Sequence, residues 1–278
     1  MTIEELLIYG KSLIHKDHAK MLLAELLEVN SLELLTMLDK KVSTDIVDKY
    51  KSMVKAVKDN KPIQYVLGNV NFYGNTFYVN ENVLIPQPDT EISVETCLNS
   101  IKASGKNNVK ILDLCTGSGA IAISLKKFLD EANIQSDISA SDISMEALRT
   151  ADENAKDILG KDEIKFMVSD LFDEITEKFD IIISNPPYIE TDKIRELSKD
   201  VQAEPHLALD GGSDGLRFYR NIRFQVENFL NKGGLVILEI GYNQMEIISN
   251  LLIENGFEIL IAKKDFAGFD RIIIAKRR

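Results

Sequence analysis

The sequence predicts an α/β fold, with a mostly parallel, doubly wound sheet of seven strands preceded by a small helical domain and a β-hairpin linker. From about residue 109 onward, short runs of β-forming apolar residues alternate with helical segments, which is the pattern of a parallel sheet covered by helices on both faces. The last two strands, 258–262 and 271–275, are joined by only eight residues. That connection is too short for a parallel crossover, so the last strand is predicted to be antiparallel.

Composition limits the classes of protein to consider. The chain has 278 residues and is 45% apolar, which is enough for one large domain and one small one. Its formal net charge of −11 argues against affinity gained mainly by neutralising nucleic-acid phosphates. The two cysteines cannot form a disulfide framework, and the three histidines are too scattered for a metal site. Because the chain shows no basic leader and no apolar run near the roughly 20 residues of a membrane span, we expect a cytoplasmic protein without membrane contacts.

Residues 1–70 are predicted to form the helical domain. Leucine and isoleucine recur there at helical spacing, and Thr2 with Glu5 matches a capping box. Ser43, and before it Asp17 and Ser31, are candidate N-caps for further short helices. Such a bundle could either pack on the rest of the chain or dock a partner protein, and the residues leave both interpretations open.

Residues 71–88 are predicted to form the linker, and residues 89–278 the larger domain. A Gly-Asn turn signal lies between two short strands within 72–79. Two prolines stiffen the segment that follows, and Asp89 or Thr90 can cap the helix that begins the larger domain.

The first strand of the larger domain, 109–114, ends in a loop suited to hold a ligand. The loop is Cys115-Thr116-Gly117-Ser118-Gly119, and a helix follows it directly. Its glycines let a ligand approach the backbone, and the helix N-terminus presents unpaired N–H groups. Asp113, just before the loop, adds a carboxylate that could bind an ammonium group. Asp142 lies about 20 residues beyond the loop, the distance at which a carboxylate reaches ribose hydroxyls in nucleotide-binding units.

A second candidate site is the corner Asn185-Pro186-Pro187-Tyr188, which follows a strand at 179–184. Two prolines cannot continue a ladder that needs N–H donors, so the strand must end at Asn185 and the backbone beyond it is stiff. The side-chain carbonyl of Asn185 and the backbone carbonyl of Pro186 could each accept one N–H of a planar NH2 group, while Tyr188 stacks on its plane. We therefore predict that this corner, at the carboxyl end of a strand, grips an amide or an exocyclic base amine.

The glycine loop fits two kinds of nucleotide site. Residues 117–122 match G-x-G-x-x-A, the dinucleotide fingerprint, with Asp142 as the acidic partner. Three features instead favour S-adenosylmethionine: Asp113 beside the loop, the corner at the fourth strand, and the closing antiparallel strands. A hydride-transfer site has no evident use for a cradle that grips an NH2 group, so S-adenosylmethionine is the favoured cofactor.

The remainder of the chain is predicted to complete the sheet. About 25 residues without strong periodicity follow the corner, and long loops of this kind are usually lids or binding segments. Asp214 can cap a helix that extends to about residue 230. Two glycines then precede a strand at 235–240, and a helix follows at about 243–254.

A set of motifs runs along nearly the whole chain. They are PIQYVLG at 62–68, FYG at 72–74, LIP at 84–86, DLCTGSG at 113–119, NPPY at 185–188, LDGG at 209–212, DGL at 214–216 and EIG at 239–241. In combination they resemble the release-factor glutamine methyltransferases, the PrmC/HemK family. The resemblance implies a class I S-adenosylmethionine-dependent methyltransferase fold behind a helical substrate-docking domain. It also implies an enzyme that methylates the side-chain amide nitrogen (N5) of the glutamine in the Gly-Gly-Gln motif of peptide chain release factors.

The resemblance also implies which residues hold the cofactor. By position, the loop 115–119 would hold the amino-acid end of S-adenosylmethionine, Asp142 its ribose, and Asp170 and Leu171 its adenine. Two positions depart from the family pattern, because Cys115 stands where glycine is common and Gln87 where arginine is usual.

The corner would then hold the substrate glutamine. Asn185, Pro186, Pro187 and Tyr188 would bind it, with Asn185 also beside the cofactor. Asn185, Pro186 and Tyr188 would carry the catalysis, and the reaction would leave S-adenosylhomocysteine as its product. We expect the enzyme to act as a monomer.

Two other functions are weighed against this one. An N6-adenine methyltransferase of DNA or RNA could use the same corner, but it would need a basic channel or a base-flipping apparatus, which the acidic chain does not show. A non-catalytic methyltransferase-like scaffold would not need both the loop and the corner intact. The partners that the resemblance implies are therefore kept as the expectation: release factors, with no direct nucleic-acid contact.

Overall fold

The chain divides into two compact units. The computed structural model describes residues 1–161, 163–265 and 267–278. The first unit consists of Met1–Asn69 and Ser198–Ala203, and the second of Val70–Leu197 and Glu204–Arg278. Within the described part of the chain, no helix combines the length and the apolar composition that crossing a bilayer requires.

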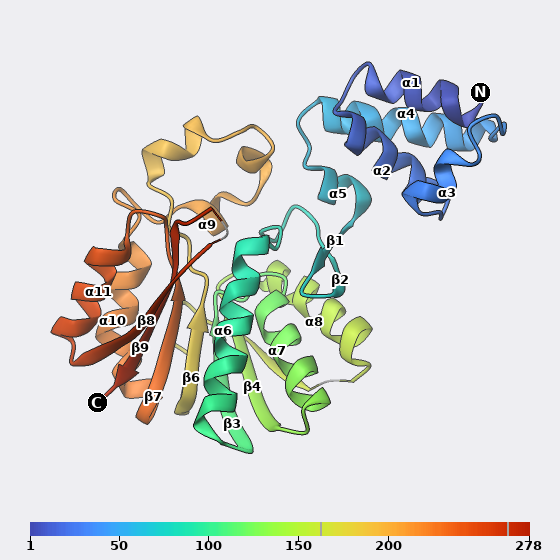
Figure 1. Ribbon diagram of the computed structural model, residues 1–278. Helices are drawn as coiled ribbons and strands as arrows, with labels where there is room; N and C mark the ends of the chain where they lie inside the picture. Colours follow the sequence, from blue (N-terminus) through green and yellow to red (C-terminus); the bar gives the residue numbers. More distant parts are fainter. Residues whose placement is uncertain (162, 266) are drawn as a thin grey trace. The chain divides into compact units, whose positions relative to one another are not determined.

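The first unit is helical (Figure 1). Leucines on the inner faces of its helices are buried together with Tyr50 and Val54. The Tyr50 hydroxyl donates to the backbone carbonyl of Ala19 at 3.1 Å, which ties the fourth helix to the second. The elements of this unit are α1 (Ile3–Lys11), α2 (Lys16–Leu26), α3 (Ser31–Leu35), α4 (Thr44–Lys58), α5 (Ile63–Leu67) and the 3-10 turn η2 (Val201–Ala203).

The first helix begins with the predicted capping box. The backbone N–H of Thr2 donates to Glu5 Oε2 at 3.0 Å, and the backbone N–H of Glu5 donates to Thr2 Oγ1 at 3.2 Å. Ser43 caps α4, as predicted.

The other two predicted caps are wrong. His15 rather than Asp17 caps α2, and Asn30 rather than Ser31 caps α3. Asn30 Oδ1 accepts the backbone N–H groups of both the second and the third helical residue at 2.9 Å. Asparagine is among the strongest N-cap residues, so the cap lies one position before the serine and Ser31 becomes the first residue of the helix.

The β-hairpin forms as predicted, with its turn one residue earlier. The strands are β1 (Asn69–Phe72) and β2 (Asn75–Tyr78). The turn residues Tyr73 and Gly74 both have positive φ, 47° and 78°, as in the two-residue turns whose twist matches that of the flanking strands. The rings of Phe72 and Phe77 meet edge to face at 5.9 Å and are buried in the core of the second unit.

The second unit is built on a seven-stranded sheet with the order β5-β4-β3-β6-β7-β9-β8. All neighbouring pairs from β5 to β7 are parallel, whereas β9 is antiparallel to both β7 and β8. The predicted sheet with its reversed last strand is therefore confirmed. Its strands are β3 (Asn108–Leu114), β4 (Gln135–Asp142), β5 (Ile164–Val168), β6 (Phe179–Ser184), β7 (Leu230–Glu239), β8 (Phe257–Lys264) and β9 (Asp270–Arg277).

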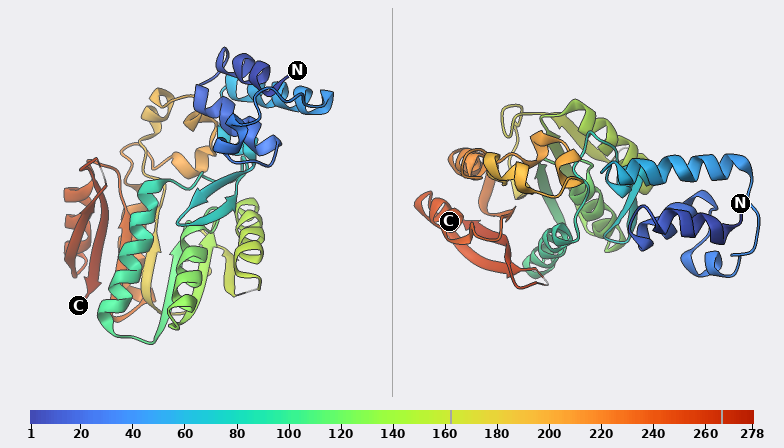
Figure 2. Two further views of the ribbon diagram at one scale, coloured as in Figure 1. Left: turned by 45° about the vertical axis from the view of Figure 1, so that its right-hand side comes forward. Right: turned by 90° about the horizontal axis from the view of Figure 1, so that it is seen from above.

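Helices cover both faces of this sheet (Figures 1 and 2). Because side chains alternate along a strand, Ile181 and Ile183 of β6 belong to one buried cluster and Ile182 to the other. The first cluster includes residues of α6 (Pro88–Ser104), α7 (Ala120–Glu131) and α8 (Met145–Leu159). The second includes residues of α10 (Arg217–Phe229) and α11 (Met245–Glu254). The short elements η1 (Thr191–Glu196) and α9 (His206–Leu209) lie between β6 and α10 in the chain.

Strand β7 is longer than predicted. It begins at Leu230, which pairs with Phe179, and it continues through both glycines to Glu239. The pairing register with β6 shifts between Phe179 and Ile181. The additional residues of β7 therefore form a bulge around Gly233, whose φ is +75°. The glycines thus form part of a bulged strand instead of preceding one.

Two helices begin at other residues than predicted. Helix α6 starts with Pro88 in its first turn and has no side-chain cap, so neither Asp89 nor Thr90 caps it. Helix α10 starts at Arg217. Asp214 accepts the backbone N–H of Leu216 at 3.2 Å but is not the N-cap of the helix.

The strand order places β3 and β6 side by side at the point where the chain reverses its direction across the sheet. The chain passes outward from β3 to β4 and β5 and then returns to β6. At the carboxyl ends, the Ser184 hydroxyl donates to the backbone carbonyl of Leu114 at 2.7 Å. Ligands of open α/β sheets bind at this kind of switch point, which here joins the glycine loop to the Asn-Pro-Pro-Tyr corner.

Candidate active site

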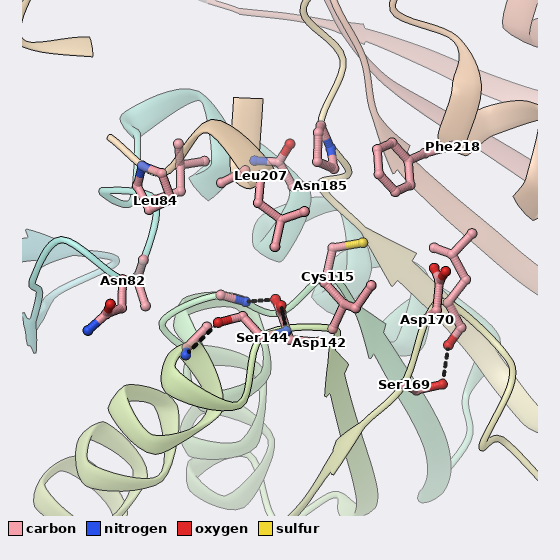
Figure 3. A pocket seen from close by; sticks show the side chains of 18 of the residues that line it. Asn82, Leu84, Cys115, Asp142, Ser144, Ser169, Asp170, Asn185, Leu207 and Phe218 are labelled. Carbon is pink, nitrogen blue, oxygen red and sulfur yellow. Dashed lines mark hydrogen bonds between the residues drawn. The ribbon is translucent and has the colours of Figure 1, made fainter. Parts of the chain in front are cut away.

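A cavity of about 500 Å3 opens at the carboxyl ends of the parallel strands (Figure 3). This volume is within the range of small-molecule sites. Of the predicted site residues, Cys115, Gly117, Asp142, Asp170, Leu171, Asn185 and Pro187 line it. Gly117 and Asn185, which are 68 positions apart in the printed sequence, therefore share one cavity. Asn185 lies across it from Asp142 in Figure 3.

Asp113 lies behind the glycine loop and is not part of the cavity lining. Its Oδ2 accepts the Thr116 hydroxyl at 2.6 Å and the backbone N–H of Ala122 at 3.2 Å, which ties the end of β3 to both sides of the loop. Burial raises the pKa of the Asp113 carboxyl to about 7, and Oδ1 has no partner among the described residues. In this geometry the carboxylate braces the loop, and a direct contact with a ligand ammonium stays a prediction.

The two glycines of the loop have different structural roles. Gly117 has a φ of +55° and open space where a Cβ would lie, so its backbone is accessible from the cavity. Gly119 has a φ of +81°, and a Cβ there would lie 2.7 Å from Ile123 Cδ1 and 3.1 Å from Ala151 Cβ. Gly119 therefore allows α7 and α8 to pack closely.

We expect Gly119→Ala to lower the free energy of unfolding by about 3 kcal/mol, because left-handed strain adds to overpacking. Gly105→Ala is the matched control, because its φ is +68° and no heavy atom lies within 4 Å of the added Cβ. That variant should lose only about 1 kcal/mol. Urea unfolding of both variants measures the difference, and equal losses would contradict the packing role.

Cys115 also adopts a left-handed backbone, with a φ of +60°. Such a conformation favours glycine, which explains why a glycine fits this position well. Burial raises the pKa of the Cys115 thiol, so the side chain is a neutral, small group in the cavity wall. It is drawn beside the cavity in Figure 3.

Asp142 is held by backbone groups on both sides. Its Oδ2 accepts the N–H of Gly117 at 2.9 Å, and its Oδ1 accepts the N–H of Ser144 at 2.9 Å. Burial raises the pKa of the Asp142 carboxyl, whereas these backbone bonds lower it. Each carboxylate oxygen keeps a further lone pair, so this side chain can accept hydroxyl groups of a ligand.

Asp170 and Leu171 line the cavity beyond β5. The Ser169 hydroxyl donates to the Leu171 carbonyl at 2.9 Å and accepts the backbone N–H of Glu174 at 3.1 Å. Leu171 has a φ of +48°. Ser169 thus holds a tight turn that presents Asp170 to the cavity.

At the corner, Asn185 and Pro187 line the cavity, whereas Pro186 and Tyr188 do not. The Asn185 Nδ2 donates to the Thr90 hydroxyl oxygen at 3.2 Å. Burial raises the pKa of Tyr188, whose side chain packs against the core on the α10 and α11 side of the sheet. The backbone carbonyl of Tyr188 accepts Gln244 Nε2 at 3.1 Å, which fixes the end of the corner.

Sequence reasoning missed part of the cavity wall. Segment 81–84, which ends on the first residue of the LIP motif, contributes four lining residues, and the start of α10 contributes three. The segment between β6 and α10, expected to be a lid or binding segment, supplies another three. None of these lining residues was singled out individually: Glu81, Asn82, Val83, Leu84, Pro205, Leu207, Ala208, Arg217, Phe218 and Asn221. Only the long aperiodic segment gave a signal that could have found some of them.

Two family models match the chain. Residues 14–68 match the PrmC N-terminal domain, and residues 91–213 match the methyltransferase small domain. A methyltransferase from Pyrococcus furiosus has a similar fold, with a TM-score of 0.53, 17% identity, and coverage of 74% of this chain and 90% of that chain. The T. thermophilus 16S rRNA N2 G1207 methyltransferase, solved in complex with AdoMet and guanosine, has a TM-score of 0.52 at 18% identity, covering 76% of this chain and 50% of that one.

Curated relatives align over the full length of the chain. The release factor glutamine methyltransferase of Clostridium botulinum is 40% identical over 100% of this chain and 100% of its own length. That of Clostridium acetobutylicum is 36% identical over 100% of this chain and 99% of its own. Full-length identity of this order, together with the cavity shared by the loop and the corner, shows that the chain belongs to the release factor glutamine methyltransferase family.

Proposed function

We propose that this chain transfers the methyl group of S-adenosylmethionine to the side-chain amide nitrogen (N5) of the glutamine in the Gly-Gly-Gln motif of peptide chain release factors. The observation that carries the proposal is the single cavity lined by both Gly117 and Asn185. A methyl donor held at the end of β3 and an amide held at the end of β6 would then face each other. Family membership supports the choice of substrate.

The residues at the loop side of the cavity fit the cofactor. Asp142 is held in place by two backbone N–H groups and keeps free lone pairs for ribose hydroxyls. Gly117 leaves its backbone open to the amino-acid end, and Asp170 with Leu171 offers a polar and an apolar surface for adenine. When bound, the cofactor supplies an electrophilic methyl group on a sulfonium.

The corner residues would orient the substrate amide. An amide nitrogen is a poor nucleophile, because its lone pair is delocalised into the carbonyl group. Pro186 does not itself line the cavity, but it stands between two residues that do, Asn185 and Pro187. The side-chain oxygen of Asn185 and the backbone carbonyl of Pro186 would each accept one N–H of the amide, aim its nitrogen and offset the positive charge that develops on it. The consecutive prolines keep these acceptors in place. Tyr188, outside the cavity lining, would then support the corner from behind or stack on a substrate that reaches beyond the cavity.

We further propose a role for the helical residues 1–70 in docking the release factor. Residues 14–68 match the PrmC N-terminal domain, which supports a function shared within the family. The linker would be 71–88 and the catalytic domain 89–278. We propose that the enzyme works as a monomer, without direct nucleic-acid contact, in the cytoplasm, where release factors act.

The test is methyl transfer from labelled S-adenosylmethionine to a purified release factor, with duplex and single-stranded DNA as comparison substrates. We expect label on the release factor only, and peptide mass spectrometry should place it on the glutamine of the Gly-Gly-Gln motif. A variant release factor with that glutamine replaced should stay unlabelled. Label on DNA would favour the N6-adenine alternative, and binding of the release factor without label would favour the scaffold alternative.

A further inference from the structure

Behind the Asn-Pro-Pro-Tyr corner lies a buried carboxyl group that the proposed mechanism does not use. Glu239 ends β7, next to the end of β6, because Ser184 and Leu238 are register partners. Its side chain is only 2% exposed, and Thr90 beside it is 5% exposed. Glu239 Oε2 has no hydrogen-bond partner among the described residues. A buried, incompletely paired carboxyl is costly, so its position beside the candidate site calls for a functional explanation.

The contacts of Glu239 lead directly to Asn185. Asn185 Nδ2 donates to Thr90 Oγ1 at 3.2 Å. The Thr90 and Asn185 side chains in turn lie close enough to the Glu239 carboxyl to lower its pKa as hydrogen-bonding neighbours. A carboxylate can only accept hydrogen bonds, so it draws the Thr90 hydroxyl proton toward itself. The Thr90 oxygen is then left as an acceptor, and only the nitrogen end of the Asn185 amide can bond to it.

We propose that Glu239 and Thr90 are a positioning pair that holds the Asn185 amide with its nitrogen inward and its oxygen toward the substrate. The inference rests on the proposed function, since it concerns how the substrate amide is gripped. An asparagine amide is nearly symmetrical in shape, so packing alone does not choose between its two orientations. A flipped Asn185 would present N–H groups to the substrate N–H groups and could not accept them. The direction of the hydrogen bonds behind the corner therefore decides whether Asn185 can accept an N–H group of the substrate amide.

The same geometry makes the positioning sensitive to protonation. A neutral Glu239 can donate its own proton to Thr90, and Thr90 can then donate to the Asn185 oxygen. The direction of both hydrogen bonds is then reversed. Burial raises the pKa of Glu239 to about 7, with a smaller contribution from Asp89, while Thr90, Arg271 and Asn185 act in the opposite direction. The hydroxyls of Tyr188 and Tyr219 also face this group. The active orientation belongs to the ionised form, so turnover should rise as pH increases through about 7.

The experiment measures kcat for release-factor methylation against pH, at saturating cofactor. We expect kcat of the wild type to rise with pH near pH 7, as a rising limb of its pH profile. Glu239→Gln should lose this rising limb, and its kcat at high pH should be about tenfold below that of the wild type, because a carboxamide can donate as well as accept. Thr90→Val should lower kcat to a similar degree, and Thr90→Ser should restore it. The affinity of all three variants for S-adenosylmethionine, measured by calorimetric titration, should stay within about twofold of that of the wild type.

Asp113→Asn is the matched control, because burial also raises the pKa of the Asp113 carboxyl to about 7 while its bonds go to the glycine loop. The rising limb should persist in this variant. The inference is overturned if Glu239→Gln keeps the limb, or if Thr90→Val and Thr90→Ser have the same kcat. If Glu239→Gln does not fold, the two Thr90 variants decide the question. Failure of the proposed function is distinct, since the wild type itself would then leave the release factor unlabelled.

Discussion

Replacing Asn185 with alanine is expected to reduce kcat for release-factor methylation about a hundredfold or more, while affinity for S-adenosylmethionine stays within about threefold. The variant removes the side-chain acceptor at the end of β6 and leaves the glycine loop and Asp142 in place. Loss of one well-placed hydrogen bond in such a site typically costs about 3 kcal/mol of transition-state stabilisation. Single-turnover methylation and calorimetric titration of the cofactor measure the two quantities separately.

A matched control for this variant lies at the opposite end of the sheet. Asn231→Ala removes an asparagine whose Nδ2 donates to Asp180 Oδ1 at 3.3 Å, near the amino ends of β6 and β7. It should keep nearly full turnover. If Asn185→Ala turned over at a rate close to that of the control, the corner would not be the place where the amide is activated.

Asp142→Ala is expected to weaken S-adenosylmethionine binding by about 2 kcal/mol or more, a factor of roughly thirty. The variant loses the carboxylate that faces the cavity and also frees the backbone N–H groups of Gly117 and Ser144. The loop and the start of α8 would then be less well held. Raising the cofactor concentration should restore much of the turnover, because the corner is unchanged.

Asp137→Ala serves as the control on the same strand. Asp137 is near the other end of β4 and pairs with Lys110 at 3.4 Å on an exposed surface. Cofactor affinity in this variant should match that of the wild type. An unchanged dissociation constant in Asp142→Ala would remove that residue from the cofactor site.

The sequence predicted the elements whose signals are local. Alternating apolar strands and helices gave the parallel sheet, and the short connection before β9 gave its reversed direction. The glycine loop and the corner were also found, because glycines and prolines constrain the backbone directly. Their meeting in one cavity followed from the rule that ligands bind at the switch point of such sheets.

Features that depend on distant partners could not be predicted in the same way. The start of β7 at Leu230 is set by its pairing with Phe179, which outweighs the turn propensity of the glycines that follow. Thr90 looked like a helix cap, but its hydroxyl instead accepts from Asn185, 95 positions away. Segment 81–84 and the start of α10 reach the cavity only through tertiary packing, and no periodicity marks them as parts of a binding site.

The position of β9 between β7 and β8 also affects how the sheet can be completed during folding. Residues 270–277 pair with both neighbours, so β7 keeps an open edge and β8 has no partner in the sheet until β9 has docked between them. Open strand edges invite pairing with other chains, so a folding intermediate in which β9 is not yet docked exposes two edges at which such pairing can start.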